Sequence, residues 1–118
     1  MKTKLINNDC IKVMKSMLSE SVVFTLTDIP YDAVNRDSNG SRKLGKKEAD
    51  IITFDLNEFL EEVYRITSNS IVIFCGKEQF SGIYEYFASK KGTVRPIIWE
   101  KSNPSPMNGQ HIYLSGVE

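Results

Sequence analysis

The chain has 118 residues, of which 41% are apolar and 25% are charged, and its 15 basic and 15 acidic side chains balance. This length predicts one compact soluble domain over residues 1–118, and zero net charge supplies no argument for a nucleic-acid partner. Two cysteines are too few for a disulfide framework, no apolar run could span a membrane, and the first residues lack the apolar core of a signal peptide. We therefore expect a cytoplasmic protein without a membrane partner.

The first half of the chain predicts a strand, a helix and a second strand. A short apolar segment at residues 4–6 is a weak strand candidate. Apolar side chains then recur at helical spacing over residues 10–17, and Asp9 is placed to cap that helix. The Val-rich run 22–26 is continuous rather than alternating, which is typical of a parallel strand covered on both faces.

The second half repeats this alternation. Residues 56–63 have helical spacing, and Asp55 with Glu58 resembles a capping box. Residues 71–75 read as another buried strand, and residues 80–87 as a helix that ends near Gly92. Weaker strands are expected at residues 94–99 and 111–117. The alternation of strands and helices predicts a three-layer α/β sheet with right-handed crossovers.

Residues 32–50 have few apolar side chains and no clear periodicity. The segment could be a solvated surface excursion, or a functional and mobile loop, because it follows a strand end where α/β sheets bind ligands. Its basic side chains could contact DNA phosphates; they are Arg36, Arg42, Lys43, Lys46 and Lys47.

The second predicted strand ends in Asp28, Ile29, Pro30 and Tyr31. The carboxylate of Asp28 can accept hydrogen bonds from an amino group, and the ring of Tyr31 offers a stacking face. Pro30 fixes the local chain direction. An ordinary strand-to-loop turn is the competing interpretation, because such turns also favour aspartate and proline.

Three segments in order resemble the DNA amino-methyltransferase family, whose members methylate adenine N6 or cytosine N4. They are residues 6–31, residues 73–79 and the Trp-x-Lys-x-Asn-Pro-x-Pro segment at 99–106. The order is the permuted one, with the catalytic motif first. Ile29 departs from the usual Asp-Pro-Pro-Tyr motif at a position thought to contribute mainly a backbone carbonyl. Aspartate at the first position favours adenine.

The resemblance implies a Rossmann-like methyltransferase sheet, mostly parallel with a final antiparallel strand and incomplete in this chain. It also implies double-stranded DNA as substrate and S-adenosylmethionine as cofactor. The target base leaves the stack, Tyr31 stacks on it, and Asp28 with the Ile29 carbonyl accepts hydrogen bonds from its amino group. The catalytic residues are then Asp28, Ile29, Pro30 and Tyr31.

Other residues have two interpretations each. Asp9 could cap its helix or lie near the cofactor, as an acidic residue there can in this family. Lys101 could be a solvated charge or a DNA contact, while Asn103 and Pro104 could line the base pocket or form a sheet-edge turn. Trp99 could be a core residue or a pocket wall.

The remaining candidates are structural. Cys10 and Cys75 have apolar neighbours in the sequence and are expected in the core. His111, the single histidine, has no cysteine at metal-ligand spacing, so no metal site is expected.

The Gly-rich loop that binds the donor in this family is absent from the sequence. The chain is therefore expected to be the amino-terminal part of a longer methyltransferase, or a shortened relative, and inactive alone. A non-catalytic remnant that binds nucleic acid or a partner is an alternative, as is an unrelated nucleotide-binding domain. An apolar edge left by a missing carboxyl-terminal half would favour self-association.

Overall fold

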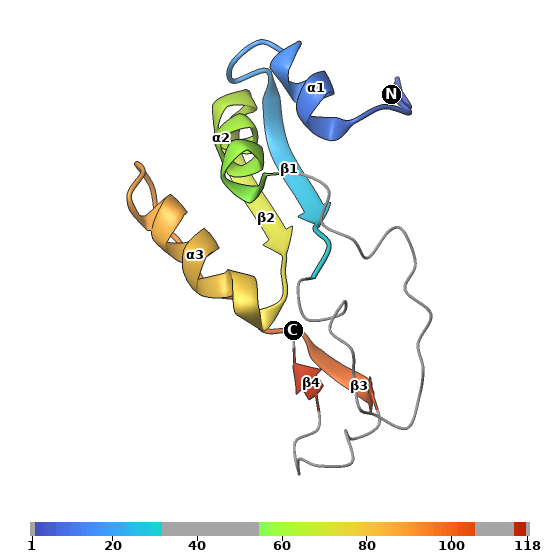
Figure 1. Cartoon of the computed structure of the whole chain (residues 1–118), viewed down its shortest axis with the longest axis vertical. Helices are drawn as coiled ribbons and strands as arrows, with labels where there is room; N and C mark the ends of the chain where they lie inside the picture. The colour runs from blue at the N-terminus through green and yellow to red at the C-terminus, as the bar shows by residue number, and fades with distance from the viewer. Residues whose placement is uncertain (1, 32–54, 106–114, 118) are drawn as a thin grey trace. The chain divides into compact units, whose positions relative to one another are not determined.

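The computed structural model describes residues 2–31, 55–105 and 115–117. Its elements, in chain order, are α1 (Cys10–Lys15), β1 (Val22–Asp28), α2 (Leu56–Ile66), β2 (Thr67–Phe74), α3 (Lys77–Ala88), β3 (Glu100–Ser105) and β4 (Ser115–Val117) (Figure 1). The basic loop expected at 32–50 lies outside the described residues, as do residues 111–114 of the expected last strand.

The described residues fall into two compact units. The first contains residues 2–27 and 55–73, with α1, α2 and most of β1 and β2. The second contains residues 28–31, 74–105 and 115–117, with α3, β3 and β4.

A pair of parallel strands, β1 and β2, makes the sheet of the first unit. The backbone N–H of Glu20 donates to the Arg65 carbonyl at 2.9 Å, and that of Ile29 donates to the Phe74 carbonyl at 3.2 Å. Both bonds join residues at the same sequence offset, so the two strands run in one direction. Helix α2 lies alongside this pair (Figure 1). The prediction of an α/β fold is confirmed at this level.

The core of the first unit forms where α1 packs against α2. Leu60 and Val63 of α2 are each 1% exposed, and Ile11 and Met14 supply the buried face of α1. These positions follow the apolar spacing of the sequence, because residues three and four apart share one helix face. The helical pattern therefore identified the buried face of α2 correctly, whereas in α1 it predicted Met14 but not Ile11.

Side-chain caps begin both helices of the first unit as predicted. An Asp9 carboxylate oxygen accepts from the Lys12 N–H at 3.0 Å, and Asp55 accepts from the Glu58 N–H at 3.0 Å. Each carboxylate satisfies a helix N–H that has no partner within its helix.

The third helix begins earlier than predicted. It starts at Lys77, three residues before Phe80, because Gly76 provides the N-cap and Gln79 completes the capping bonds. It ends at Ala88, and Gly92 beyond it has φ +123°, a conformation that favours glycine.

Two expected strands are absent from the described residues. Residues 4–6 and 94–99 have no strand pairing, and the strand near Trp99 starts only at Glu100. Leu5 is 93% exposed, so no sheet neighbour covers it, and Pro96 lacks the N–H that a ladder requires. Instead, β3 pairs with β4 in an antiparallel arrangement.

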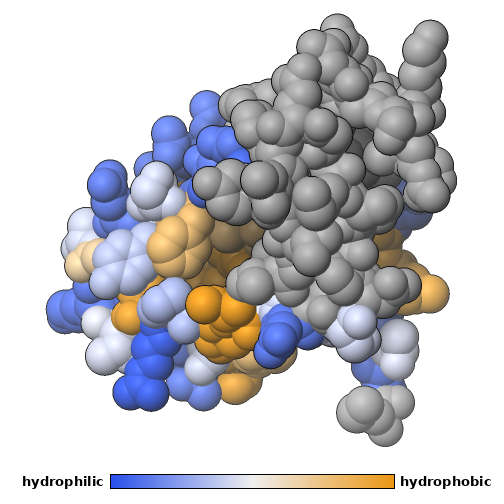
Figure 2. All heavy atoms as spheres, turned by 90° about the horizontal axis from the view of Figure 1, so that it is seen from below, coloured by the Kyte–Doolittle hydropathy of each residue, from blue (hydrophilic) through white to orange (hydrophobic). Residues whose placement is uncertain are grey.

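The expectation that β1 is covered on both faces is wrong. Val23, Phe24 and Leu26 are each more than half exposed. The described sheet has two strands beside α2, which leaves apolar side chains without cover. Figure 2 shows apolar surface beside hydrophilic side chains on the face seen from below.

The expectation that Cys10 is a core residue is also wrong, since its side chain is exposed. Helix α1 has six residues and buries Ile11 and Met14, and Cys10 is its first residue, at the end of the helix. Within the described ranges, no helix is both long and apolar enough to cross a bilayer.

Candidate functional site

The predicted catalytic residues form a turn at the carboxyl end of β1, which we call the Asp28–Tyr31 turn. Asp28 is the last residue of the strand, and its side chain is exposed. Ile29 is 4% exposed, while Pro30 and Tyr31 are half-buried. The carboxylate is thus accessible, whereas the residue next to it is anchored in the protein.

Two hydrogen bonds hold this turn. The Ile29 N–H donates to the Phe74 carbonyl at the end of β2, at 3.2 Å. The side-chain amide of Gln79 donates to the Pro30 carbonyl at 2.8 Å. The turn is therefore fixed on both sides of the Ile29–Pro30 peptide.

Gly76 lies against the last residue of the turn. A Cβ atom at position 76 would be 3.2 Å from the Tyr31 Cβ and 3.5 Å from its Cγ. A Cβ contact of 3.2 Å is tighter than most in proteins. The lack of a side chain at Gly76 therefore leaves room for the Tyr31 side chain.

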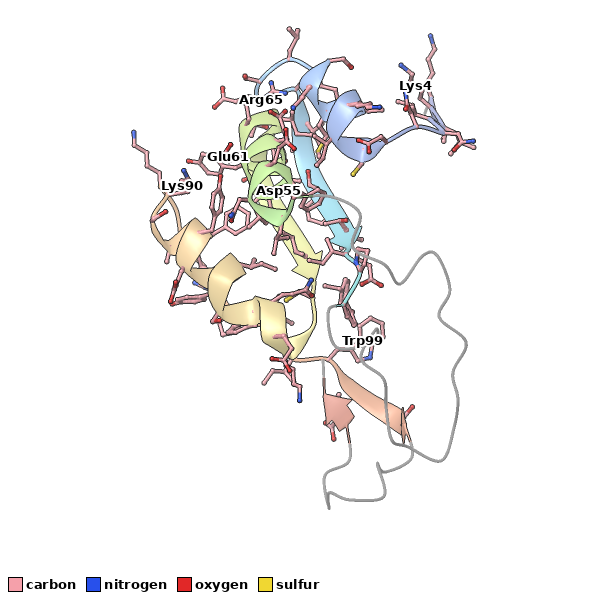
Figure 3. The ribbon with its side chains drawn as sticks, in the orientation of Figure 1. Lys4, Asp55, Glu61, Arg65, Lys90 and Trp99 are labelled. Atoms are coloured by element: carbon pink, nitrogen blue, oxygen red, sulfur yellow. The ribbon has the colours of Figure 1, made fainter. Side chains whose placement is uncertain are left out.

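An aromatic pair lies at the end of β2. The ring centroids of Phe74 and Trp99 are 5.6 Å apart, with their planes at 58°, which is a favourable tilted arrangement. Trp99 is more than half exposed and directly precedes β3 (Figure 3). This exposure excludes the interpretation of Trp99 as a core residue. Its interpretation as part of a pocket wall stays a prediction.

Cys75 follows Phe74 and is half-buried. Burial raises the pKa of its thiol above the usual value, because the thiolate loses hydration. This favours the neutral thiol, which agrees with a packing role rather than a nucleophilic one.

The structure brings together only part of the predicted site. The Asp28–Tyr31 turn lies in the second unit, whereas Asp9 belongs to the first and caps α1. Lys101, Asn103 and Pro104 lie in β3, and the structure describes only the backbone of these three residues. The predicted phosphate contacts lie outside the described residues: Arg36, Arg42, Lys43, Lys46 and Lys47.

Two residues of this site were not singled out from the sequence, Gly76 and Gln79. A glutamine three residues after a potential N-cap is a recognisable capping pattern, and it could have located the start of α3. The bond from Gln79 to Pro30 joins residues 49 positions apart. No local pattern could have revealed it.

Comparisons with known proteins give no match. No protein-family model matches this sequence, and neither the curated proteins nor the solved structures include a significant match. The observations that bear on function are therefore the sequence motifs and the geometry of the Asp28–Tyr31 turn.

The described residues do not form a cradle for S-adenosylmethionine. The space beside Gly76, which a Gly-rich loop would leave for a ligand, is taken by Tyr31. Asp9, the predicted cofactor contact, has one carboxylate oxygen engaged in capping. Nor do three metal-ligating side chains gather anywhere in the described part of the chain.

Proposed function

We propose that this chain is the base-handling part of a site-specific DNA methyltransferase acting on the exocyclic N6 amino group of adenine. The observation that carries the proposal is the Asp28–Tyr31 turn. It presents an exposed carboxylate at a strand end, while hydrogen bonds to Ile29 and Pro30 hold the backbone beside it. Preorganised acceptors of this kind are effective because they need no rearrangement during the reaction.

The roles of the residues follow from the chemistry of an aromatic amine. The N6 lone pair of adenine is delocalised into the ring, so it is a poor nucleophile. Asp28 and the Ile29 carbonyl would each accept a hydrogen bond from one N–H of the amino group, which directs the nitrogen lone pair out of the ring plane. Tyr31 would stack on the base after it leaves the helix, a step that costs a few kcal/mol. S-adenosylmethionine is the proposed methyl donor, although the described residues form no site for it.

We also propose that the strands belong to a three-layer Rossmann-like sheet. A parallel β1–β2 pair whose carboxyl ends carry the turn, and an antiparallel β3–β4 pair, are compatible with a three-layer Rossmann-like sheet with an antiparallel last strand. In open α/β sheets, ligands bind at this carboxyl edge. The proposed substrate is double-stranded DNA, and the proposed compartment is the cytoplasm.

A methyl-transfer assay tests the proposal. The complete product of the reading frame containing this chain is incubated with double-stranded DNA and donor carrying a labelled methyl group. The DNA is then digested and its nucleosides are analysed by mass spectrometry. We expect N6-methyladenine, and a loss of at least about 100-fold in rate for Asp28→Ala, as for removal of a key polar group in other enzymes.

Glu61→Gln is the matched control, because Glu61 is an exposed carboxylate on α2 in the first unit (Figure 3). It should retain the wild-type rate. N4-methylcytosine as product would correct the target base. DNA binding without any transfer would replace the proposal with that of a non-catalytic binding module, and an unchanged rate in Asp28→Ala would refute the assigned catalytic role.

A further inference from the structure

Gln79 is the one polar residue that is fully buried among the described residues, with 4% of its surface exposed. It lies in the first turn of α3, in the second unit. Burying an amide is costly unless its polar atoms are hydrogen-bonded. The oxygen and the nitrogen of this amide are both hydrogen-bonded, which offsets the cost of burying them.

The two ends of the Gln79 side chain do different things. Its oxygen accepts from the Gly76 N–H at 3.0 Å, which caps α3. Its nitrogen donates to the Pro30 carbonyl at 2.8 Å. Capping alone needs only the oxygen, and a glutamate would serve equally well. The nitrogen is needed only for the turn.

This second bond fixes the direction of a neighbouring carbonyl. The Ile29 N–H is held by the Phe74 carbonyl, and the Pro30 carbonyl is held by Gln79. The peptide between Ile29 and Pro30 is planar, and the proline ring restricts the next torsion angle. With both flanking groups anchored, the Ile29 carbonyl has little freedom to turn.

We infer that Gln79 is a positioning residue that aims the Ile29 carbonyl at the amino group of the target base. The inference rests on the proposed function for the identity of that base. Gln79 does not touch the base. It acts through Pro30, and Gly76 assists by leaving space for Tyr31.

Two substitutions separate positioning from capping. Gln79→Glu keeps an oxygen for the Gly76 N–H but replaces the donor to Pro30 with a second acceptor. Gln79→Met has a similar length and removes both bonds. Both are compared with the wild-type product of the complete reading frame, in the assay described above.

For Gln79→Glu we expect kcat to fall roughly 100-fold, the size of effect that a displacement of about 1 Å can have. The KM for DNA should change by less than about threefold, because phosphate contacts supply most of the affinity. A purely structural role would lower the amount of active enzyme and leave the KM and the pH profile of the active fraction as in the wild type. If Gln79 positions the turn, the pH profile of kcat in Gln79→Glu should also differ from that of the wild type. Protonating the introduced carboxyl restores a donor to the Pro30 carbonyl and should therefore raise kcat at low pH. Gln79→Met should lose activity without this recovery.

Amide hydrogen exchange provides a readout that is independent of catalysis. In Gln79→Glu, the Ile29 N–H should exchange at least tenfold faster than in the wild type, while the N–H groups of Leu60 and Val63 in the first-unit core stay unchanged. If the wild type transfers no methyl group, the proposed function fails, and exchange at Ile29 alone decides whether Gln79 holds the turn. Wild-type exchange at Ile29 together with wild-type kcat would overturn the inference.

Discussion

Arg65, at the carboxyl end of α2, shows how one side chain can organise a connection between elements. Its guanidinium donates to the Met14 carbonyl at 2.7 Å and to the Met17 carbonyl at 2.9 Å. It also forms an ion pair with Glu62 at 2.6 Å. Figure 3 shows Arg65 at the end of α2 beside the connection from α1 to β1. Arg65 thus adds side-chain donors to carbonyls at and beyond the end of α1, where the Met14 carbonyl also accepts from the Met17 N–H at 2.9 Å.

Replacing this residue tests its contribution to folding. We expect Arg65→Met to lower the free energy of unfolding by about 2 kcal/mol, because hydrogen bonds to charged groups are worth about 1.5–3 kcal/mol. Arg65→Lys should recover only part of the loss, since an ammonium group lacks the fork geometry that reaches both carbonyls. Urea denaturation followed by circular dichroism measures the difference.

Arg95→Met serves as the control, because Arg95 is an exposed cation in the second unit. Its unfolding curve should match that of the wild type. A wild-type curve for Arg65→Met would show that solvent replaces the guanidinium without loss.

At the scale of single elements, α2 is defined by its cap and its buried face. The Asp55 carboxylate binds the Glu58 N–H, and the apolar side chains four and five residues after Asp55 are buried. Glu58 also forms an ion pair with Lys15 of α1, in which both side chains are largely exposed. Exposed pairs of this kind contribute little to stability, so the cap and the core determine the helix.

Removing the cap should have a measurable effect. Asp55→Ala is expected to reduce the free energy of unfolding by about 1 kcal/mol, the typical value for an N-cap aspartate. Asp55→Asn should retain most of the stability, because its side-chain oxygen can still accept from Glu58. Thermal and urea unfolding of the three proteins provide the comparison, and equal stability of wild type and Asp55→Ala would contradict the assignment of the cap.

At the scale of the whole molecule, one side of β1 carries apolar side chains that are largely exposed to solvent. Phe24 is 51% exposed and Leu26 is 62% exposed. Residues two apart on a strand point to the same face, so these side chains form one apolar patch. Patches of this kind favour association in water.

We therefore predict that the chain self-associates at high concentration. The double substitution Phe24→Ser and Leu26→Ser should shift it toward the monomer in light scattering coupled to size-exclusion chromatography. Leu18→Ser is the matched control, because Leu18 is an exposed apolar residue outside the strand. A monomeric wild type at high concentration would contradict the prediction.

The fold was predictable where the signal was local. The caps at Asp9 and Asp55 and the buried face of α2 follow from spacing within one helix turn. The strand expected near Trp99 was misplaced by several residues, because β-branched and aromatic content marks a strand only when a partner strand is present. Burial of Cys10 and of both faces of β1 was also predicted incorrectly, since apolar character does not determine which face is covered.

The sequence by itself determined the alternation of helices and strands, the helix caps and the order of residues in the Asp28–Tyr31 turn. These features depend on neighbours within about four positions, which is the range of capping and helical periodicity. Tertiary structure decided how that turn is held. The bonds from Phe74 and Gln79 join residues more than forty positions away to Ile29 and Pro30. Such contacts exist only once β1 and β2 have paired and α3 has formed with Gly76 as its N-cap.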